Sequence, residues 1–167
     1  SWDIEEKKGQ TNGVYSCNLY STGGIGHVCA HYQKLFDLGF GGIRKQVEAK
    51  MAEIKVGDAD RKPKREFYEA NLIVLDAVEA FIRRYAALAA EMAEKETDEQ
   101  RKKELLRISA NCERVAADTP RDFWEAIQLW MIATFIICIE SNGHSVTYGR
   151  FDKLFYPFYK KDIENGT

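Results

Sequence analysis

The spacing of apolar residues divides the chain into a loop-rich start, residues 1–30, and a helical body, residues 31–167. In the start, glycines alternate with Thr, Ser and Asn without a helical period, which predicts loops and one short extended piece at residues 28–32. In the body, apolar residues recur every three or four positions, which is the period of an amphipathic helix. The pattern therefore predicts a mainly α fold. The expected helices span residues 31–54, 63–95, 97–117, 120–139 and 150–164.

Local signals set the limits of these helices. A cluster of glycines at 39–42 weakens the first helix, and Pro63 suits the first turn of the second. Residues 97–100 (Thr-Asp-Glu-Gln) have the form of a capping box, which starts the third helix. Residues 119–120 place Thr as N-cap and Pro at the first position of the fourth. Pro157 is expected to interrupt the last helix.

The second and fourth helices carry the strongest hydrophobic signals. The fourth is apolar nearly all round, so we expect it to be buried on most sides and to need a larger protein around it. Its longest apolar run, Leu129 to Ile139, has 11 residues, which is too short to span a bilayer. The second helix is predicted to bury one broad face, made of Phe67, Ala70, Ile73, Leu75, Val78, Phe81, Ile82, Tyr85 and Leu88.

Composition narrows the class of protein. The 24 basic and 26 acidic side chains give a net charge of −2, which excludes binding to nucleic acid through an excess of positive charge. A 45% apolar and 12% aromatic content is that of a packed, soluble globular chain and excludes disorder. The four cysteines lack a CxxC spacing, which favours reduced thiols in the cytoplasm. The chain starts at Ser1 with no signal peptide and no Met, so we expect a piece or a processed form.

Candidate chemistry begins with His144 and Ser145, which follow directly on the most hydrophobic helix. A buried helix that ends in polar residues brings hydrogen-bonding groups to the inner side of a fold, where they need partners. These residues therefore indicate the floor of a substrate pocket. The alternative is an ordinary polar loop after a helix, with Gly143 in a left-handed conformation.

His27, Cys29 and His31 form a second candidate group because they alternate along the chain. In an extended strand, all three would face one side and could bind a metal ion. No fourth ligand stands at a standard spacing, so singly hydrogen-bonded histidines around a core cysteine are the alternative. The glycine cluster at 23–26 lacks the Lys-Ser/Thr of a phosphate loop, so no nucleotide site is expected.

Four groups of residues, in this order between about residue 13 and residue 165, form a specific combination. They are Gly24-Ile25-Gly26-His27-Val28 with Tyr32, Lys34-Leu35, Gly39 and Gly42-Ile43; Lys64-Arg65-Glu66-Phe67-Tyr68-Glu69-Ala70; Glu96-Thr97-Asp98 with Cys112, Val115 and Phe123-Trp124-Glu125-Ala126-Ile127-Gln128; and Glu140-Ser141-Asn142-Gly143-His144-Ser145 with Gly149-Arg150-Phe151-Asp152 and Tyr156-Pro157-Phe158-Tyr159-Lys160-Lys161-Asp162. The combination resembles the glycyl radical enzymes of the pyruvate formate-lyase-like superfamily, above all the B12-independent glycerol and propanediol dehydratases. The resemblance implies that residues 1–167 are part of a single domain, the helical portion of a ten-stranded α/β barrel.

The same resemblance implies a diol dehydratase. In that chemistry a thiyl radical abstracts hydrogen beside one hydroxyl of glycerol or propane-1,2-diol, and the neighbouring hydroxyl leaves as water. By the resemblance, His27 and His144 bind the substrate hydroxyls, one of them protonates the leaving group, and Ser145 fixes the orientation. A radical-SAM activating enzyme installs the glycyl radical. The implied parent is an anaerobic, cytoplasmic homodimer that binds neither nucleic acid nor membrane, and a bacterial microcompartment is an alternative location.

Two motifs of the family do not occur in this sequence: the thiyl-forming Cys-x-Glu motif and the radical-bearing Arg-Val-x-Gly-Tyr loop. None of the four cysteines matches the thiyl position, so we expect no catalytic residue, metal or bound cofactor in this chain. The chain resembles an internal piece from the N-terminal half of such an enzyme. We expect it to be inactive alone and to have the remainder of the parent as its partner.

Three other functions compete with this interpretation. A choline C–N lyase needs aromatic faces around a quaternary ammonium, for which Tyr20 is the nearest candidate. Pyruvate formate-lyase needs an arginine clamp for a carboxylate, which the sequence does not place. His31 departs from the acidic or small polar residue expected before Tyr32 in the family. A function of another class is a non-catalytic helical interaction module that docks through the aromatic C-terminal segment.

Overall fold

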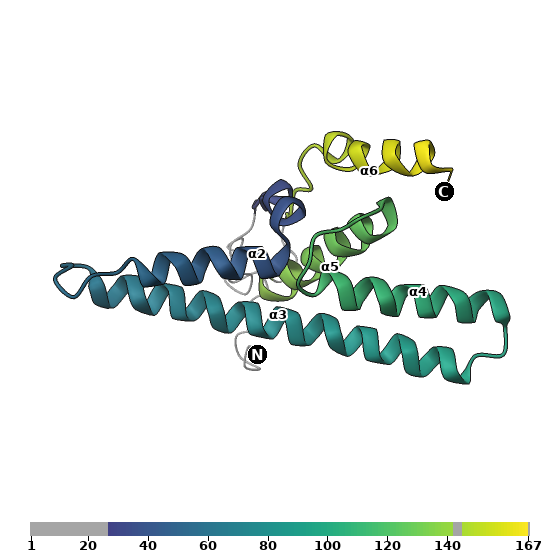
Figure 1. Ribbon diagram of the computed structural model, residues 1–167, viewed down its shortest axis with the longest axis horizontal. Helices are drawn as coiled ribbons and strands as arrows, with labels where there is room; N and C mark the ends of the chain where they lie inside the picture. The colour runs from purple at the N-terminus through teal and green to yellow at the C-terminus, as the bar shows by residue number, and fades with distance from the viewer. Residues whose placement is uncertain (1–26, 142–144, 167) are drawn as a thin grey trace, which may run out of the picture.

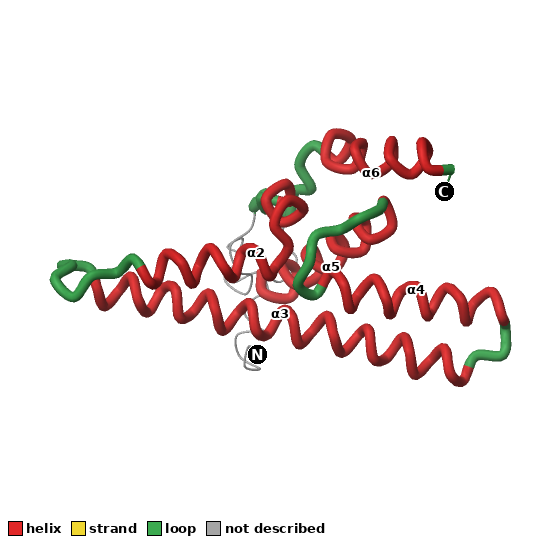
Figure 2. The backbone as a smooth tube through the Cα atoms, in the orientation of Figure 1, coloured by secondary structure: helices red, strands yellow, loops and turns green. Residues whose placement is uncertain are grey.

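The structure, a computed structural model, describes residues 27–141 and 145–166. Five helices follow one another along these residues, and the mainly α prediction is confirmed (Figures 1 and 2). Helix α3 runs the length of the molecule, α2 and α4 lie along its two halves, and α5 and α6 pack on one side of this layer (Figure 1). The helices are α2 (Tyr32–Ala52), α3 (Arg61–Lys95), α4 (Glu99–Val115), α5 (Phe123–Ser141) and α6 (Phe151–Asn165).

Helix α2 bends at the predicted weak point. Gly39 has a φ of 64° and a ψ of 174°, which breaks the helical path, and helical conformation resumes after it. At the bend, the N–H of Gly41 donates to the carbonyl of Ala117 at 2.7 Å. A Cβ on Gly39 would lie 2.5 Å from that same carbonyl oxygen. The glycine therefore lets α2 approach the backbone of the α4–α5 connection.

Helix α3 agrees with its predicted limits within two residues, and Pro63 lies in its first turn. Part of its predicted apolar face is wrong for this chain. Leu75, Val78 and Ile82 are buried, but other large apolar residues of the face stay exposed. The reason is geometric, because α2 and α4 cover only one side of a helix that is longer than either. The exposed members of the predicted face are Phe67, Ile73, Tyr85 and Leu88.

The starts of α4 and α5 differ from the predicted caps. Helix α4 is capped by Asp98, whose carboxylate accepts the N–H of Arg101 at 2.7 Å, and Thr97 lies outside the helix. Helix α5 begins after Asp122, whose carboxylate accepts the N–H of Glu125 at 2.8 Å, so Thr119 is not its N-cap. In both places an aspartate near the predicted threonine makes the capping bond, because a carboxylate is favoured at the positive end of the helix dipole.

Replacing Asp98 with alanine tests this assignment. We expect Asp98→Ala to lower the free energy of unfolding by about 1 kcal/mol, because the N–H of Arg101 loses its acceptor. Thr97→Ala, at the cap position that the sequence favoured, is the matched control and should change little. Urea denaturation followed by circular dichroism measures both, and a larger loss for Thr97→Ala would refute the assignment.

Helix α6 continues through Pro157, so the predicted interruption is wrong. Proline in a helix interior removes one hydrogen bond and crowds the preceding turn. Packing of neighbouring aromatic residues offsets this cost. Phe155 and Phe158 meet the ring of Phe36 edge-to-face, with ring centres 5.4 and 5.5 Å away. These ring contacts hold α6 against α2.

Helix α5 is the most apolar element. Its stretch from Phe123 to Glu140 is long and apolar enough to cross a membrane by length and composition alone, so the 11-residue run understated its apolar length. The core helix of a water-soluble protein passes the same test. Glu125 and Thr134 favour a core helix, because both are buried and make polar contacts inside the protein. Phe135 stays 54% exposed, so the described residues do not bury α5 fully.

The start of α5 is fixed by Glu125, a fully buried carboxylate. It accepts the backbone N–H of Arg121 at 2.7 Å and the guanidinium of the same residue at 2.5 Å. The Nε of Arg114 on α4 lies 3.5 Å away. Asp162 of α6 accepts the N–H of Phe123 at 2.9 Å. These contacts hold α4, α5 and α6 together at the start of α5.

Candidate functional site

The segments that precede α2 and follow α5 lie side by side. Cys29 and Thr147 form a parallel β-bridge, and the N–H of Thr147 donates to the carbonyl of Val28 at 2.8 Å. His27 stands two residues before Cys29, and Ser145 stands two residues before Thr147. Two of the three residues predicted to bind substrate therefore hold equivalent positions on neighbouring segments. His144, the third, lies outside the described residues.

His27 and Ser145 also share an unusual backbone conformation. Their φ angles are 57° and 54°, and within 27–141 and 145–166 they are the only residues other than glycine with a positive φ. Such conformations are rare outside glycine and concentrate at functional sites, where the surrounding structure holds them. Both residues are exposed, so their side chains are accessible from outside the helical layer. The shared conformation marks the junction of the two segments independently of any sequence motif.

Four side chains close to this pairing contact one another, and we name them the junction cluster. They come from α2, α5 and the segment before α6: Tyr32, Trp130, Thr134 and Tyr148. The hydroxyl oxygens of Tyr32 and Thr134 are 3.0 Å apart, and Thr134 donates to the carbonyl of Trp130 at 2.8 Å. The rings of Trp130 and Tyr148 meet in a T-shape at 4.9 Å. Burial raises the pKa of Tyr32 above its ordinary value, so the phenol stays protonated at neutral pH.

The metal alternative fails on the described residues. His31 is the N-cap of α2, and its Nδ1 accepts the N–H of Lys34 at 3.1 Å. Within the part of the chain that the structure describes, no three side chains of His, Cys, Asp or Glu are grouped so that they could hold a metal ion. The alternation of His27, Cys29 and His31 therefore gives a capping histidine and a bridge-forming cysteine.

Arg150 lies close to the junction but is already paired. Its guanidinium donates twice to the carboxylate of Asp152, at 2.6 and 2.9 Å. This hydrogen bonding lowers the pKa of Asp152 to about 2. An arginine neutralised in this way is a poor clamp for a substrate carboxylate, which weakens the comparison with pyruvate formate-lyase proper.

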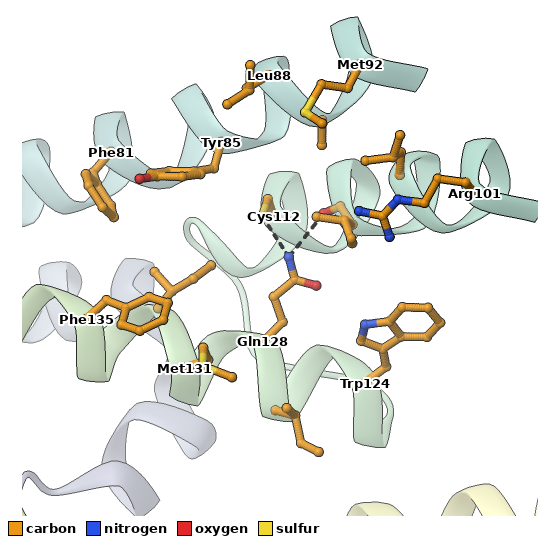
Figure 3. Close-up of a pocket in the computed structure, with 15 residues that line it drawn as sticks. Phe81, Tyr85, Leu88, Met92, Arg101, Cys112, Trp124, Gln128, Met131 and Phe135 are labelled. Carbon is orange, nitrogen blue, oxygen red and sulfur yellow. Dashed lines mark hydrogen bonds between the residues drawn. The ribbon is translucent and has the colours of Figure 1, made fainter. Parts of the chain in front are cut away.

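A second feature, which sequence reasoning missed, is an apolar groove between α3, α4 and α5 with a volume of about 460 Å³ (Figure 3). Its polar floor is satisfied internally. Gln128 donates to the sulfur of Cys112 at 2.9 Å and accepts from Asn111 at 3.2 Å. Burial raises the pKa of the Cys112 thiol, so this cysteine is not a thiolate nucleophile. The groove thus offers apolar surface and no reactive group. Its walls include Tyr85, Leu88, Met92, Trp124, Met131 and Phe135.

Comparison with known proteins identifies the family. The sequence model described as pyruvate formate lyase-like matches residues 3–167. The chain belongs to the pyruvate formate lyase-like family.

Individual members of the family show the same relation. The (2S)-3-sulfopropanediol dehydratase of Klebsiella oxytoca is 41% identical over 167 residues, which are 99% of this chain and 20% of that protein. A solved structure on 1,2-propanediol dehydration in Roseburia inulinivorans has a TM-score of 0.86 and 38% identity, over 98% of this chain and 21% of the other. A glycyl radical enzyme from Archaeoglobus fulgidus has a TM-score of 0.80 and 36% identity, over 86% of this chain and 18% of the other.

These likenesses settle two predictions. The resemblance to the glycyl radical enzymes is confirmed, and the described helices are the helical part of that α/β-barrel fold. The chain spans about a fifth of the length of the relatives that it matches.

Proposed function

We propose that this chain is part of a glycyl radical dehydratase and that the junction of segments 27–29 and 145–149 forms one wall of its diol site. The observation that carries the proposal is the pairing of these two segments, which gives His27 and Ser145 equivalent places and the same left-handed backbone. Glycerol or propane-1,2-diol is the proposed substrate. The similarity to a propanediol-dehydrating enzyme supports this class of substrate.

The roles of the wall residues follow from their chemistry. The thiyl and glycyl radicals, which belong to the remainder of the parent, supply hydrogen abstraction. His27 and His144 hydrogen-bond to the two hydroxyl groups of the diol. A protonated imidazole donates its proton to the departing hydroxyl, which leaves as water, and histidine can do this near neutral pH. Ser145 orients the diol through its hydroxyl group.

The remainder of the parent polypeptide is the proposed partner of the apolar groove. Members of the family are about five times longer than this chain, so most of each polypeptide lies outside it. The groove presents apolar walls and a polar floor whose hydrogen bonds are made internally, which suit an apolar helix of the same polypeptide.

The parent is proposed to be a cytoplasmic homodimer activated by a radical-SAM enzyme.

A sulfonated diol is a second candidate substrate. The sulfopropanediol dehydratase of Klebsiella oxytoca favours it, because 41% identity extends over nearly the whole chain. The two candidates share the vicinal diol and differ in a negatively charged group, which a separate cationic side chain must bind.

Turnover by the full-length parent tests the proposal. The parent is activated without oxygen, its glycyl radical is quantified by electron paramagnetic resonance, and glycerol, propane-1,2-diol, (2S)-3-sulfopropanediol and choline are supplied in turn. We expect a diol to be converted to the corresponding aldehyde. Cleavage of choline alone, or a full radical signal with no dehydration of any diol, would contradict the proposal.

A further inference from the structure

We propose that the hydrogen bond between Tyr32 and Thr134 is a positioning contact, which sets how segment 27–29 meets segment 145–149. Its catalytic consequence rests on the proposed function, whereas its structural consequence does not. Tyr32 is the first residue of α2 and Thr134 lies in the second half of α5, 102 positions further along the chain. Both are buried, with 4% and 7% of their surface exposed.

The direction of this hydrogen bond follows from counting protons. Thr134 has one hydroxyl proton, which it donates to the carbonyl of Trp130. Tyr32 must therefore donate its own proton to Thr134. The order is phenol to threonine hydroxyl to main-chain carbonyl, so every proton in this buried chain of hydrogen bonds has an acceptor.

Helix α5 thereby becomes a common platform for both segments. Thr134 holds Tyr32, which follows segment 27–29 by three residues. One helical turn earlier, on the same face, the ring of Trp130 holds Tyr148, which directly follows Thr147. The two segments are thus attached to neighbouring positions of one rigid helix, which fixes their relative placement beyond what a single bridge can do.

Two substitutions separate positioning from simple stability. Thr134→Val removes the acceptor and leaves the Tyr32 hydroxyl buried without one, which destabilises the fold. Tyr32→Phe removes the donor and keeps the ring. The double variant replaces the pair with apolar groups of nearly the same shape, so its unfolding midpoint should return close to that of the wild type.

Hydrogen exchange at the amide of Thr147 measures the placement directly, in the natural polypeptide that contains this chain. We expect exchange to accelerate by about fivefold or more in both single variants and to stay fast in the double variant, although its stability recovers. Asn111→Ala, which breaks the bond to Gln128 in the groove, is the control. It should lower the unfolding midpoint and leave the Thr147 amide unchanged.

Two outcomes overturn the proposal. If the exchange rate of the Thr147 amide changed in proportion to the unfolding midpoint in all four variants, the Tyr32–Thr134 pair would contribute to stability only. Exchange that stays at the wild-type value in both single variants would show that the pair does not position the segments.

In the activated parent, Tyr32→Phe should lower kcat about tenfold with little change in KM, because misplacement of the wall residues affects the reacting geometry. If no diol is turned over, the proposed function fails while the exchange experiment still decides the positioning contact.

Discussion

Gly39→Ala should destabilise the protein by about 3 kcal/mol, the largest loss that we expect from a single added methyl group. The φ of 64° and ψ of 174° belong to a region that is essentially restricted to glycine. The added Cβ would lie 2.5 Å from the carbonyl oxygen of Ala117 and 2.7 Å from the carbonyl carbon of Asp118. Because both neighbours are backbone atoms, neither can rotate away, and α2 would have to move from the α4–α5 connection.

Gly57→Ala is the matched control for this variant. Among the described residues, no atom beyond its chain neighbours lies within 4 Å of a Cβ at Gly57, and its backbone is not left-handed. Its free energy of unfolding should stay within about 0.5 kcal/mol of the wild type or rise slightly, because alanine restricts the unfolded chain. Chemical denaturation of both variants provides the comparison. Equal stabilities for the two would contradict the bend and the close backbone approach at Gly39.

His27→Ala in the full-length parent should lower kcat for a diol by about 100-fold to 10,000-fold, the range for loss of a general acid. The expected reason is the loss of an imidazole at the junction, where the backbone of His27 parallels that of Ser145. His144→Ala should also lower kcat, because its imidazole is proposed to bind the other hydroxyl group of the diol, and the larger of the two losses identifies the general acid. Steady-state kinetics at a known radical content measures both, with thermal unfolding to verify that the variants are folded.

His31→Asn is the control for the histidine variants. The side-chain oxygen of the introduced asparagine can replace the His31 Nδ1 that accepts the N–H of Lys34, so α2 keeps its cap. Turnover should stay within about threefold of the wild type. If His31→Asn abolished turnover and His27→Ala did not, the assignment of the wall residues would be wrong.

Much of the fold could be predicted from the sequence, because an amphipathic helix places apolar residues at every third or fourth position of a continuous segment. The predicted limits of α2 and α3 lie within two residues of the observed ones. Pro157 misled the prediction because aromatic contacts with Phe36 on another helix outweigh its local cost. The threonine caps failed for a similar reason, since an aspartate close by could make the same bond.

The site was less accessible to sequence reasoning. Family motifs singled out His27 and Ser145, but nothing local indicates that their segments pair or share a positive φ. The Tyr32–Thr134 contact joins residues 102 positions apart, so no spacing rule could find it. The groove had one available signal, because the fourth predicted helix was apolar on more sides than its neighbours in this chain could cover.

A crystal structure of the full-length parent with propane-1,2-diol bound will show whether the junction of segments 27–29 and 145–149 lines the substrate site. We expect a hydroxyl oxygen of the diol to lie within about 3.2 Å of an imidazole nitrogen of His27 or His144, with the Cys29–Thr147 bridge intact beside it. A diol bound away from both histidines, with segments 27–29 and 145–149 apart, would contradict the claim that this junction is a wall of the substrate site.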